Sequence, residues 1–309
     1  MARDARLKSL FLLPAVAVSA LFALTSLGMV AVADGQRLAW LGAALASLAL
    51  PLVPARLVLR PVARTAEYLP MHLLVAVVGL VLAGRGMYSN FVTSWELYND
   101  FPAAVVSAFV PTADNVPGLI AILATVLLAL YVFWYSRFGR HPDARLDVGS
   151  KLPDFVVKEL DGTAVRSADL LGAPTVFLFY RGNWCPLCMA QIGELVERYG
   201  ELEKLGITVC LISPQPADRT RELAERHGVR FRYFLDEDNR AARELGIAVD
   251  NGVPLGVPGH YPSATVMPTM FVTTAGGTIV FSDQTDNYRV RPEPDIFLAI
   301  LRRSGAVTA

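Results

Sequence analysis

The stretch FYRGNWCPLCMAQI, from Phe179 to Ile192, holds two of the three cysteines of this 309-residue chain and decides the fold of its second half. An apolar run that ends at Tyr180 predicts a buried strand, and helical periodicity begins at Cys188. Pro186 favours the first turn of a helix, where its missing N–H is not needed. Cys185 and Cys188 are therefore expected at the junction between a strand and a helix.

This placement predicts a reactive dithiol. A thiolate at a helix N-terminus is stabilised by unpaired N–H groups and by the helix dipole, and two intervening residues on a turn let the sulfurs form a disulfide. A zinc site would need two further ligands, and no His stands at a suitable spacing, so we expect no metal and no other cofactor. Two inert core cysteines are the other alternative. For Cys210, inside the apolar run ITVCLIS, a buried structural role is the expectation.

From residue 151 onwards, short apolar runs alternate with helical periods, which predicts an α/β domain over residues 151–309 with helices on both faces of a sheet. Residues 139–150 are expected to form a polar linker. Further expected elements are a hairpin at 154–166, strands at 174–180, 207–213 and 231–236, helices at 188–204, 216–228 and 237–246, a hairpin at 269–283 and a closing helix at 293–305.

Residues 9–138 carry few charges and long apolar stretches, which predicts a transmembrane helical domain over residues 1–138. A helix needs about 20 apolar residues to cross the hydrocarbon core of a bilayer. Four stretches approach this length: Ser9–Ala33, Leu38–Leu59, Leu69–Met87 and Leu119–Phe138. AVADG, at Ala31–Gly35, also resembles a signal-peptide cleavage site, but the apolar run before it exceeds the roughly 7–15 residues of a signal core.

Basic residues set the expected orientation, because cytoplasmic flanks of membrane helices are rich in Lys and Arg. The flanks expected in the cytoplasm carry Arg3, Arg6 and Lys8, then Arg56, Arg60 and Arg64, then Arg137, Arg140 and Arg145. The two opposite connections carry only Arg37 and Arg85. The sequence thus predicts an integral protein of a bacterial-type inner or plasma membrane, with the C-terminal domain in the cytoplasm. The aromatic-rich segment 88–118 is expected to form an interfacial helix or to bind a partner.

The second half resembles the thioredoxin superfamily and, within it, the alkyl hydroperoxide reductase/thiol-specific antioxidant family of peroxiredoxin-like proteins, or redoxins. The resemblance covers residues 147–303 and is carried by VGSKLPDFVVKELDGTAVRSADLLG, FYRGNWCPLCMAQIGEL, ISPQPADRTRELAERHGVRFRYFLDEDNRAARELGI, MPTMFVTTAGGTIVFSD and YRVRPEP. It implies a central mixed sheet covered by helices, fused here to a four-helix membrane region.

The departures from the peroxiredoxin pattern favour disulfide exchange. The family's active-site Thr falls on Cys185 or Gly182, and its later Arg falls on or next to Pro268. In their place stand a thioredoxin-like WCxxC and the Pro of MPT. The resemblance implies that Pro268 is a cis proline and that Met267 offers its backbone to a substrate.

Other residues follow from the same resemblance. Trp184, Pro186 and Thr269 complete the expected substrate-binding set. Arg181 is a candidate stabiliser of the thiolate, and Phe179 stands where thioredoxins carry a buried carboxylate.

The sequence therefore predicts a membrane-anchored thiol–disulfide oxidoreductase, in which an exposed Cys185 attacks and Cys188 resolves. Its partners would be the lipid bilayer, a protein disulfide or thiol and an external reductant. The net charge of zero gives no basic stripe for nucleic acid. Two alternatives stay open: a thiol peroxidase that reduces hydroperoxides at the membrane, and a non-enzymatic redox sensor that controls a membrane partner.

Overall fold

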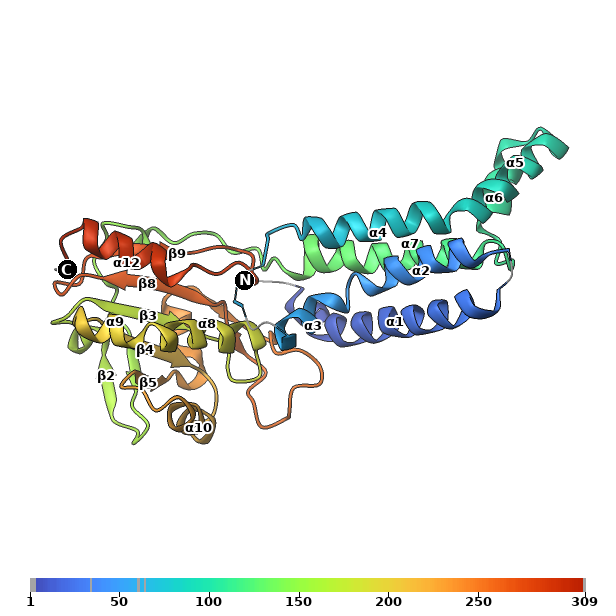
Figure 1. Cartoon of the computed structure of the whole chain (residues 1–309). Coiled ribbons are helices and arrows are strands. Elements are labelled where there is room, and N and C mark those ends of the chain that lie inside the picture. Colours follow the sequence, from blue (N-terminus) through green and yellow to red (C-terminus); the bar gives the residue numbers. More distant parts are fainter. Residues whose placement is uncertain (1–3, 34, 60–61, 64, 308–309) are drawn as a thin grey trace. The chain divides into compact units, whose positions relative to one another are not determined.

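The computed structural model of the chain, drawn in Figure 1, describes residues 4–33, 35–59, 62–63 and 65–307. The basic residues Arg3, Arg60 and Arg64, which the orientation prediction used, lie outside this part. The chain forms two compact units. A helical unit comprises Phe11–Leu59 and Tyr68–Tyr135, and an α/β unit comprises Met1–Leu10, Arg60–Glu67 and Ser136–Ala309.

The helical unit is built from apolar helices. They are α1 (Ala5–Val32), whose first turns belong to the α/β unit, α2 (Arg37–Leu48), α3 (Leu52–Leu59), α4 (Pro70–Ala83), α5 (Arg85–Tyr98), α6 (Phe101–Phe109) and α7 (Val116–Ala129), which continues as a π-helical turn, η1 (Leu130–Tyr135).

The prediction of four membrane-spanning helices is confirmed only in part. Within the described ranges, two helices are long and apolar enough to cross a membrane, α1 and the continuous helix Val116–Tyr135. Helices α4 and α5 form a third candidate only if they are counted as one span, bent by 41°. The second predicted span, Leu38–Leu59, is interrupted between α2 and α3 at Pro51, whose ring nitrogen cannot continue the helical hydrogen bonds.

Small residues hold α2, α4 and α7 together. The contact is lined by Ala43, Ala46, Ala83, Ala121 and Ala124. A Cβ atom added to Gly42 would lie 2.6 Å from the carbonyl oxygen of Gly79, so the backbones of α2 and α4 meet directly. Such close approach is typical of helix packing in membranes, where side chains gain little from avoiding the lipid.

The aromatic-rich segment 88–118 is helical rather than extended, since it contains most of α5 and all of α6. Asn115 fastens its end: the Asn115 amide donates to the carbonyl oxygens of Ser107 at 3.0 Å and Val110 at 2.9 Å. Its own oxygen accepts from Asn90 Nδ2 at 2.6 Å. The prediction that this helical pair lies at the membrane interface or binds a partner stays a prediction.

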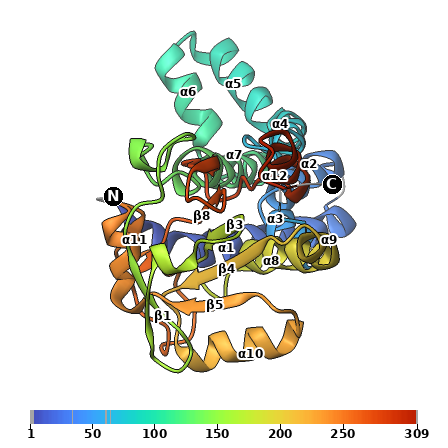
Figure 2. The same ribbon diagram turned by 90° about the vertical axis from the view of Figure 1, so that its left-hand side faces the viewer.

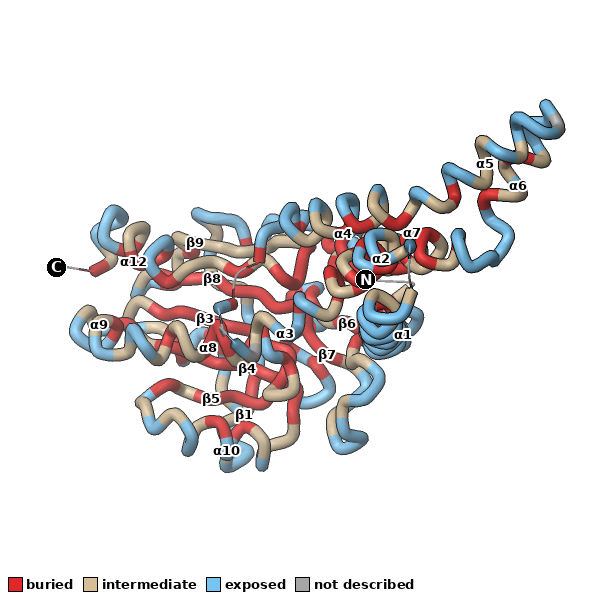
Figure 3. The backbone as a smooth tube through the Cα atoms, turned by 45° about the vertical axis from the view of Figure 1, so that its right-hand side comes forward, coloured by how far each residue is buried: buried red, intermediate tan, exposed pale blue. Residues whose placement is uncertain are grey.

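The α/β unit contains a seven-stranded mixed sheet in the order β2-β1-β5-β4-β3-β8-β9. Strands β3, β4 and β5 run parallel, and the other neighbouring pairs are antiparallel. The strands are β1 (Val156–Lys158), β2 (Ala164–Arg166), β3 (Thr175–Phe179), β4 (Thr208–Ser213), β5 (Arg232–Leu235), β8 (Thr269–Thr273) and β9 (Ile279–Asp283). They confirm the predicted hairpins and buried strands, and the central strands lie in the buried interior in Figure 3.

Helices cover both faces of this sheet. Figure 2 shows α8 (Pro186–Glu197), α9 (Tyr199–Lys204) and α12 (Pro294–Arg303) on one side of the sheet, and α10 (Ala217–His227) packs against β5. The short helix α11 (Arg240–Glu244) lies on the opposite side in this view and contacts β1. The single helix predicted over 188–204 is interrupted at Arg198, and a small sheet of β6 (Ala248–Val249) and β7 (Thr265–Val266) was not predicted.

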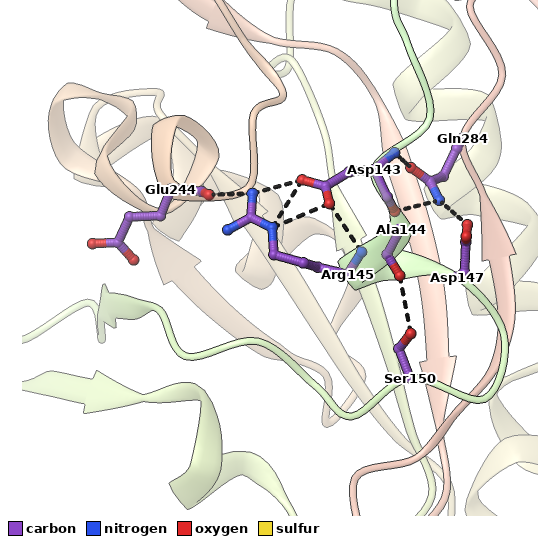
Figure 4. Close-up of polar contacts among 7 residues, drawn as sticks. All are labelled: Asp143, Ala144, Arg145, Asp147, Ser150, Glu244 and Gln284. Atoms are coloured by element: carbon purple, nitrogen blue, oxygen red, sulfur yellow. Dashed lines mark hydrogen bonds and ion pairs between the residues drawn. The ribbon is translucent and has the colours of Figure 1, made fainter.

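The predicted linker, residues 139–150, is fixed to the α/β unit (Figure 4). The Asp143 N–H donates to Gln284 Oε1 at 2.7 Å, and Gln284 Nε2 donates back to the Asp143 carbonyl at 3.1 Å. Arg145 bonds the Asp143 carboxylate at 2.6 Å and the Glu244 carbonyl at 3.0 Å. A segment held by this many bonds cannot act as a free tether.

Arg289 holds a second connecting segment. Its guanidinium is fully buried and donates to Ser136 Oγ at 2.7 Å, Thr65 Oγ1 at 3.1 Å and the carbonyl oxygens of Ala66 and Glu67 at 3.2 and 2.8 Å. Thr65, Ala66 and Glu67, here called the strap, are thereby part of the α/β unit. Because each bond comes from a charged donor in the interior, its loss leaves a costly unpaired group.

Candidate active site

The cysteine pair stands where the sequence predicts it, between β3 and α8. Cys185 is the N-cap of α8 in an extended conformation (φ −95°, ψ 106°), and Pro186 occupies the first turn. The Cys185 N–H donates to the Gly182 carbonyl at 3.1 Å, and its carbonyl accepts from the Met189 N–H at 3.0 Å. This turn and first helical bond fix the direction of both sulfurs.

The pKa values of the two thiols are shifted in opposite directions. A hydrogen bond from the Cys188 thiol lowers the pKa of Cys185 to about 6, against the opposing effect of burial, and the positive charges of Arg181 and Arg291 add to the lowering. Burial raises the pKa of Cys188 well above its ordinary value, and the adjacent Cys185 adds to that rise. At neutral pH the pair is therefore one thiolate and one thiol that donates to it.

Both cysteines are free thiols and both are buried. Cys185 is 3 % exposed and Cys188 is 0 % exposed, so the prediction of an exposed Cys185 is wrong for this state. The reason lies in the crowding of the helix start. Arg181, itself 4 % exposed, folds over the Trp184 ring and donates through Nη2 to the Gly252 carbonyl, which brings the loop after β6 to the site.

Arg181 lies among three aromatic rings. Its guanidinium carbon is 4.7 Å from the centre of Trp184, 5.5 Å from Tyr288 and 5.8 Å from Phe138, all within the range of cation–π attraction. These contacts hold the charge in place without neutralising it. Phe138 and Tyr288 were not singled out from the sequence, because they lie far along the chain from the cysteines.

Arg291 is a second charge that the sequence did not single out. It is 4 % exposed, and its Nε and Nη2 atoms have no hydrogen-bond partner among the described residues. Its charge lowers the pKa of both cysteines. It stands in YRVRPEP, one of the stretches that carry the family resemblance. The sequence therefore marked its position, but not its effect on the pKa values of the cysteines.

The predictions for the segment Met267–Thr269, that it lies at the site and that Pro268 is cis, are confirmed only in part. Met267 and Pro268 line a narrow hollow with Arg181 and Phe138, so the fold does bring them to the site. No peptide bond in the described part of the chain is cis, and Pro268 is therefore trans, contrary to the prediction. The trans form is the more stable one for most X–Pro bonds, and Pro268 here continues an extended chain between β7 and β8.

The backbone of Met267 is already hydrogen-bonded within the protein. Its N–H donates to the Ile247 carbonyl at 2.7 Å, and its carbonyl accepts from Thr269 Oγ1 at 2.8 Å. Both residues are 1 % exposed. The predicted substrate-facing backbone is thus occupied in this state.

Gln215 is a positioning residue that sequence reasoning missed. Its Oε1 accepts from the Asn183 N–H at 2.8 Å, and its Nε2 donates to Asn183 Oδ1 and Tyr180 Oη at 3.0 Å and to Thr220 Oγ1 at 3.1 Å. It joins the cysteine loop to β3 and α10. The only signal was its place in ISPQPADRT, directly after β4.

An open pocket lies next to Trp184. Its volume is about 280 Å³, and it is lined by Asn183, Trp184, Arg219, Glu222, Arg226, Pro258, His260 and Tyr261. Trp184 therefore meets the pocket, while Pro186 is exposed on the first turn of α8. Through Trp184, this pocket adjoins the loop that carries the two cysteines.

The remaining candidates are structural. Cys210 is 0 % exposed in β4, which confirms its expected burial, and this burial raises its pKa to about 12. The Phe179 ring packs on Phe271 at 6.1 Å, in the aromatic core. In the described ranges, no three His, Cys, Asp or Glu side chains lie close enough to hold a metal ion.

Known proteins share parts of this architecture. The AhpC/TSA family matches residues 148–282. The thiol-disulfide oxidoreductase ResA of Geobacillus thermodenitrificans (strain NG80-2) is 31 % identical over 127 residues, which are 41 % of this chain and 72 % of that protein. The chloroplastic peroxiredoxin Q of Oryza sativa subsp. japonica is 29 % identical over 106 residues, 34 % of this chain and 49 % of that protein. The chain thus spans about half the length of the peroxiredoxin relative.

The solved structure of the peroxidoxin BcpB from Mycobacterium tuberculosis is similar at a TM-score of 0.42 and 21 % identity. The similarity covers 51 % of this chain and 97 % of that one.

Proposed function

This chain belongs to the AhpC/TSA family and is an oxidoreductase that acts on thiols, and we propose that it works as a membrane-anchored thiol–disulfide oxidoreductase through Cys185 and Cys188. The observation that carries the proposal is that the pKa values of the two thiols are shifted in opposite directions. Cys185 has a pKa of about 6, whereas that of Cys188 is raised well above its ordinary value. A low-pKa nucleophile beside a protonated partner is the arrangement that thiol–disulfide exchange uses.

The reaction follows from these roles. The Cys185 thiolate attacks one sulfur of a substrate disulfide, breaks its S–S bond and forms a mixed disulfide, while the other substrate sulfur leaves as a thiolate. Cys188 then loses its proton and attacks Cys185, which releases the second substrate thiolate and closes the Cys185–Cys188 disulfide. Two electrons pass to the substrate, and an external dithiol reductant restores the pair. Trp184, Pro186, Met267, Pro268 and Thr269 would frame the substrate once the site opens.

A thiol peroxidase is the second candidate, favoured by the two arginines near the sulfurs and by the peroxiredoxin relative. A Cys185 thiolate would take one oxygen from a hydroperoxide, giving an alcohol and a sulfenic acid, and Cys188 would condense with it to a disulfide and water. The family's Thr and Arg are replaced by Cys185 or Gly182 and by Pro268. These replacements favour disulfide exchange.

Rapid kinetics on the reduced full-length protein in detergent separate the two reactions. Disulfide exchange predicts brisk reduction of insulin disulfides and slow reaction with hydrogen peroxide. Cys188→Ser should trap a mixed disulfide, and Cys185→Ser should abolish turnover. Fast sulfenic acid formation in Cys188→Ser, together with little insulin reduction by the wild-type protein, would assign the peroxidase instead.

A redox sensor without turnover remains the third candidate. It would bind a membrane partner differently in its dithiol and disulfide forms. Pull-down of the full-length protein under oxidising and reducing conditions tests this, and redox-dependent capture without catalytic turnover would favour the sensor.

We further propose that the helical unit crosses the membrane four times and that the α/β unit lies in the cytoplasm, as the basic flanks indicate. Because Cys185 is buried, a cysteine placed at exposed Lys204 is the better probe. Lys204→Cys should escape an impermeant maleimide in intact cells and react after permeabilisation, with the wild-type protein as the background. Labelling in intact cells would put the α/β unit on the outer side.

A further inference from the structure

The loop between β6 and β7 begins with the charged residue Asp250, and the rest of it, residues 251–264, has an unusual composition for an exposed segment. The chain carries no Lys, Arg, Asp or Glu from Asn251 to Ser282. Leu255 is 49 % exposed at the loop's surface, and Val253, Val257 and Tyr261 are partly exposed. A soluble surface loop of this length would ordinarily carry charges, so its apolar side chains suggest a partner that accepts them.

A hydrogen bond ties this loop to the start of α1. The Leu255 N–H donates to the Ser9 carbonyl at 2.7 Å, within the α/β unit. Ser9 directly precedes the apolar stretch of α1, one of the helices long enough to span a membrane. Leu7 and Leu10, on either side of it, are 64 % and 50 % exposed. Leu255 is therefore held at the point where α1 would enter lipid.

The same loop also reaches the redox site. The Gly252 carbonyl accepts from Arg181, the residue that stacks on Trp184. Further along, Pro258, His260 and Tyr261 form one wall of the pocket that Trp184 lines on the other side. One segment thus joins the first turns of α1 to the rim of the active-site pocket.

From these contacts we propose that residues 251–264 are a membrane-contacting loop that lies in the interface of the lipid bilayer. The inference rests on the proposed membrane anchoring. Leu255 and Val257 bury their side chains among the upper acyl carbons, and Tyr261 takes the interfacial position that suits an aromatic ring with a polar end. The pocket beside Trp184 then opens along the membrane surface, so the site serves thiols and disulfides held close to the bilayer.

Lipid photolabelling of the full-length protein tests this loop. The protein is reconstituted in phosphatidylcholine vesicles that contain a phosphatidylcholine with a carbene-generating group near the ester end of one acyl chain. Peptide mapping after illumination should find lipid adducts on residues 251–264 and on α1. The surroundings of Val156, which is 48 % exposed on β1, should carry none. Leu255→Asp should lower the loop adducts several-fold, and the matched control Val156→Asp should leave them unchanged.

The outcomes are distinct. Adducts on α1 without adducts on 251–264 overturn the proposal and leave the membrane anchoring intact. Absence of adducts on α1 would overturn the proposal of membrane anchoring, and the loop proposal that rests on it. Insulin-disulfide reduction, measured on the same preparation, reports separately on the proposed thiol chemistry.

Discussion

The guanidinium of Arg181 lies 4.7 Å from the centre of the ring of Trp184, the residue directly before Cys185. This contact links the charge near Cys185 to the access of other molecules to it. Arg181 lowers the pKa of Cys185, and the Trp184 ring on which Arg181 stacks crowds the start of α8. A substrate that displaces Trp184 would also loosen the arginine. We therefore expect opening of the site to change the reactivity of the Cys185 thiol.

The pH dependence of alkylation tests the lowered pKa of Cys185. Because only the thiolate reacts, the rate with iodoacetamide should rise about tenfold per pH unit below pH 6 and level off above it. Cys188→Ala removes the hydrogen bond that contributes most to this shift, so the midpoint of Cys185 should move to higher pH. Mass spectrometry of the alkylated peptide measures both profiles, and a midpoint near the ordinary value of a thiol would contradict the assignment.

Replacing Arg181 should change the same profile. Arg181→Met removes a positive charge close to the thiolate and should raise its midpoint by about one pH unit. Arg230→Met is the matched control, because Arg230 is an exposed arginine whose side chain pairs with Glu203 away from the cysteines. If both variants keep the wild-type midpoint, Arg181 serves packing alone.

Gly182 is required by its conformation and by its neighbours. Its φ of +140° is strained for other residues, and a Cβ there would lie 2.8 Å from Trp184 Nε1. Gly182→Ala should lower the free energy of unfolding by about 1–3 kcal/mol. In Gly193→Ala, on α8, the added Cβ meets nothing within 4 Å, so this control should be neutral or more stable by up to about 1 kcal/mol. Denaturant unfolding in detergent compares the two, and equal effects would refute the argument.

The contact of α2 with α4 depends on Gly42. In Gly42→Val, the added atoms would collide with the Gly79 carbonyl, and the helical unit should lose about 1–3 kcal/mol or repack. Gly28→Val places the same side chain on α1, where nothing lies within 4 Å of the added Cβ. Thermal aggregation of the detergent-solubilised variants should separate them by several degrees. If Gly28→Val were as unstable as Gly42→Val, the loss of stability would come from placing valine in a helix and not from the contact of α2 with α4.

Arg289 should be essential for holding the strap. Arg289→Leu leaves the acceptors in the strap without their donor and should cost about 3 kcal/mol or more. Limited proteolysis should then cut near residues 65–67, whereas the wild-type protein should resist cleavage there. Arg303→Leu, at an exposed position near the end of α12, should leave protection unchanged. Unchanged cleavage in Arg289→Leu would remove the proposed role.

Local patterns were sufficient to predict much of the α/β unit. The apolar run before Tyr180, the Asp161-Gly162 turn and Gly228 after α10 each determine their structure through neighbouring residues, and the elements appear there. The helix start at Pro186 and the burial of Cys210 follow the same rule. Such features depend on periodicity and capping, which the sequence displays directly.

Features formed by distant residues could not be predicted in this way. Arg291, Tyr288 and Gln215 reach the cysteines only through the tertiary fold. The exposure of Cys185 was misjudged for the same reason, because the loop that carries Gly252 returns to Arg181 from 71 residues away. The four predicted membrane crossings are supported only in part, since hydropathy does not register the interruption at Pro51 or the bend between α4 and α5.

The anchoring of the strap has a consequence for biosynthesis. Thr65 and Arg289 are 224 residues apart, so the ribosome must translate most of the protein before the partner of this short segment exists. Until then the strap emerges without its donor while the first helices are already leaving the exit tunnel. The final closure of the molecule is thus a late event of synthesis, and nascent chains arrested before codon 289 would keep residues 65–67 open to protease.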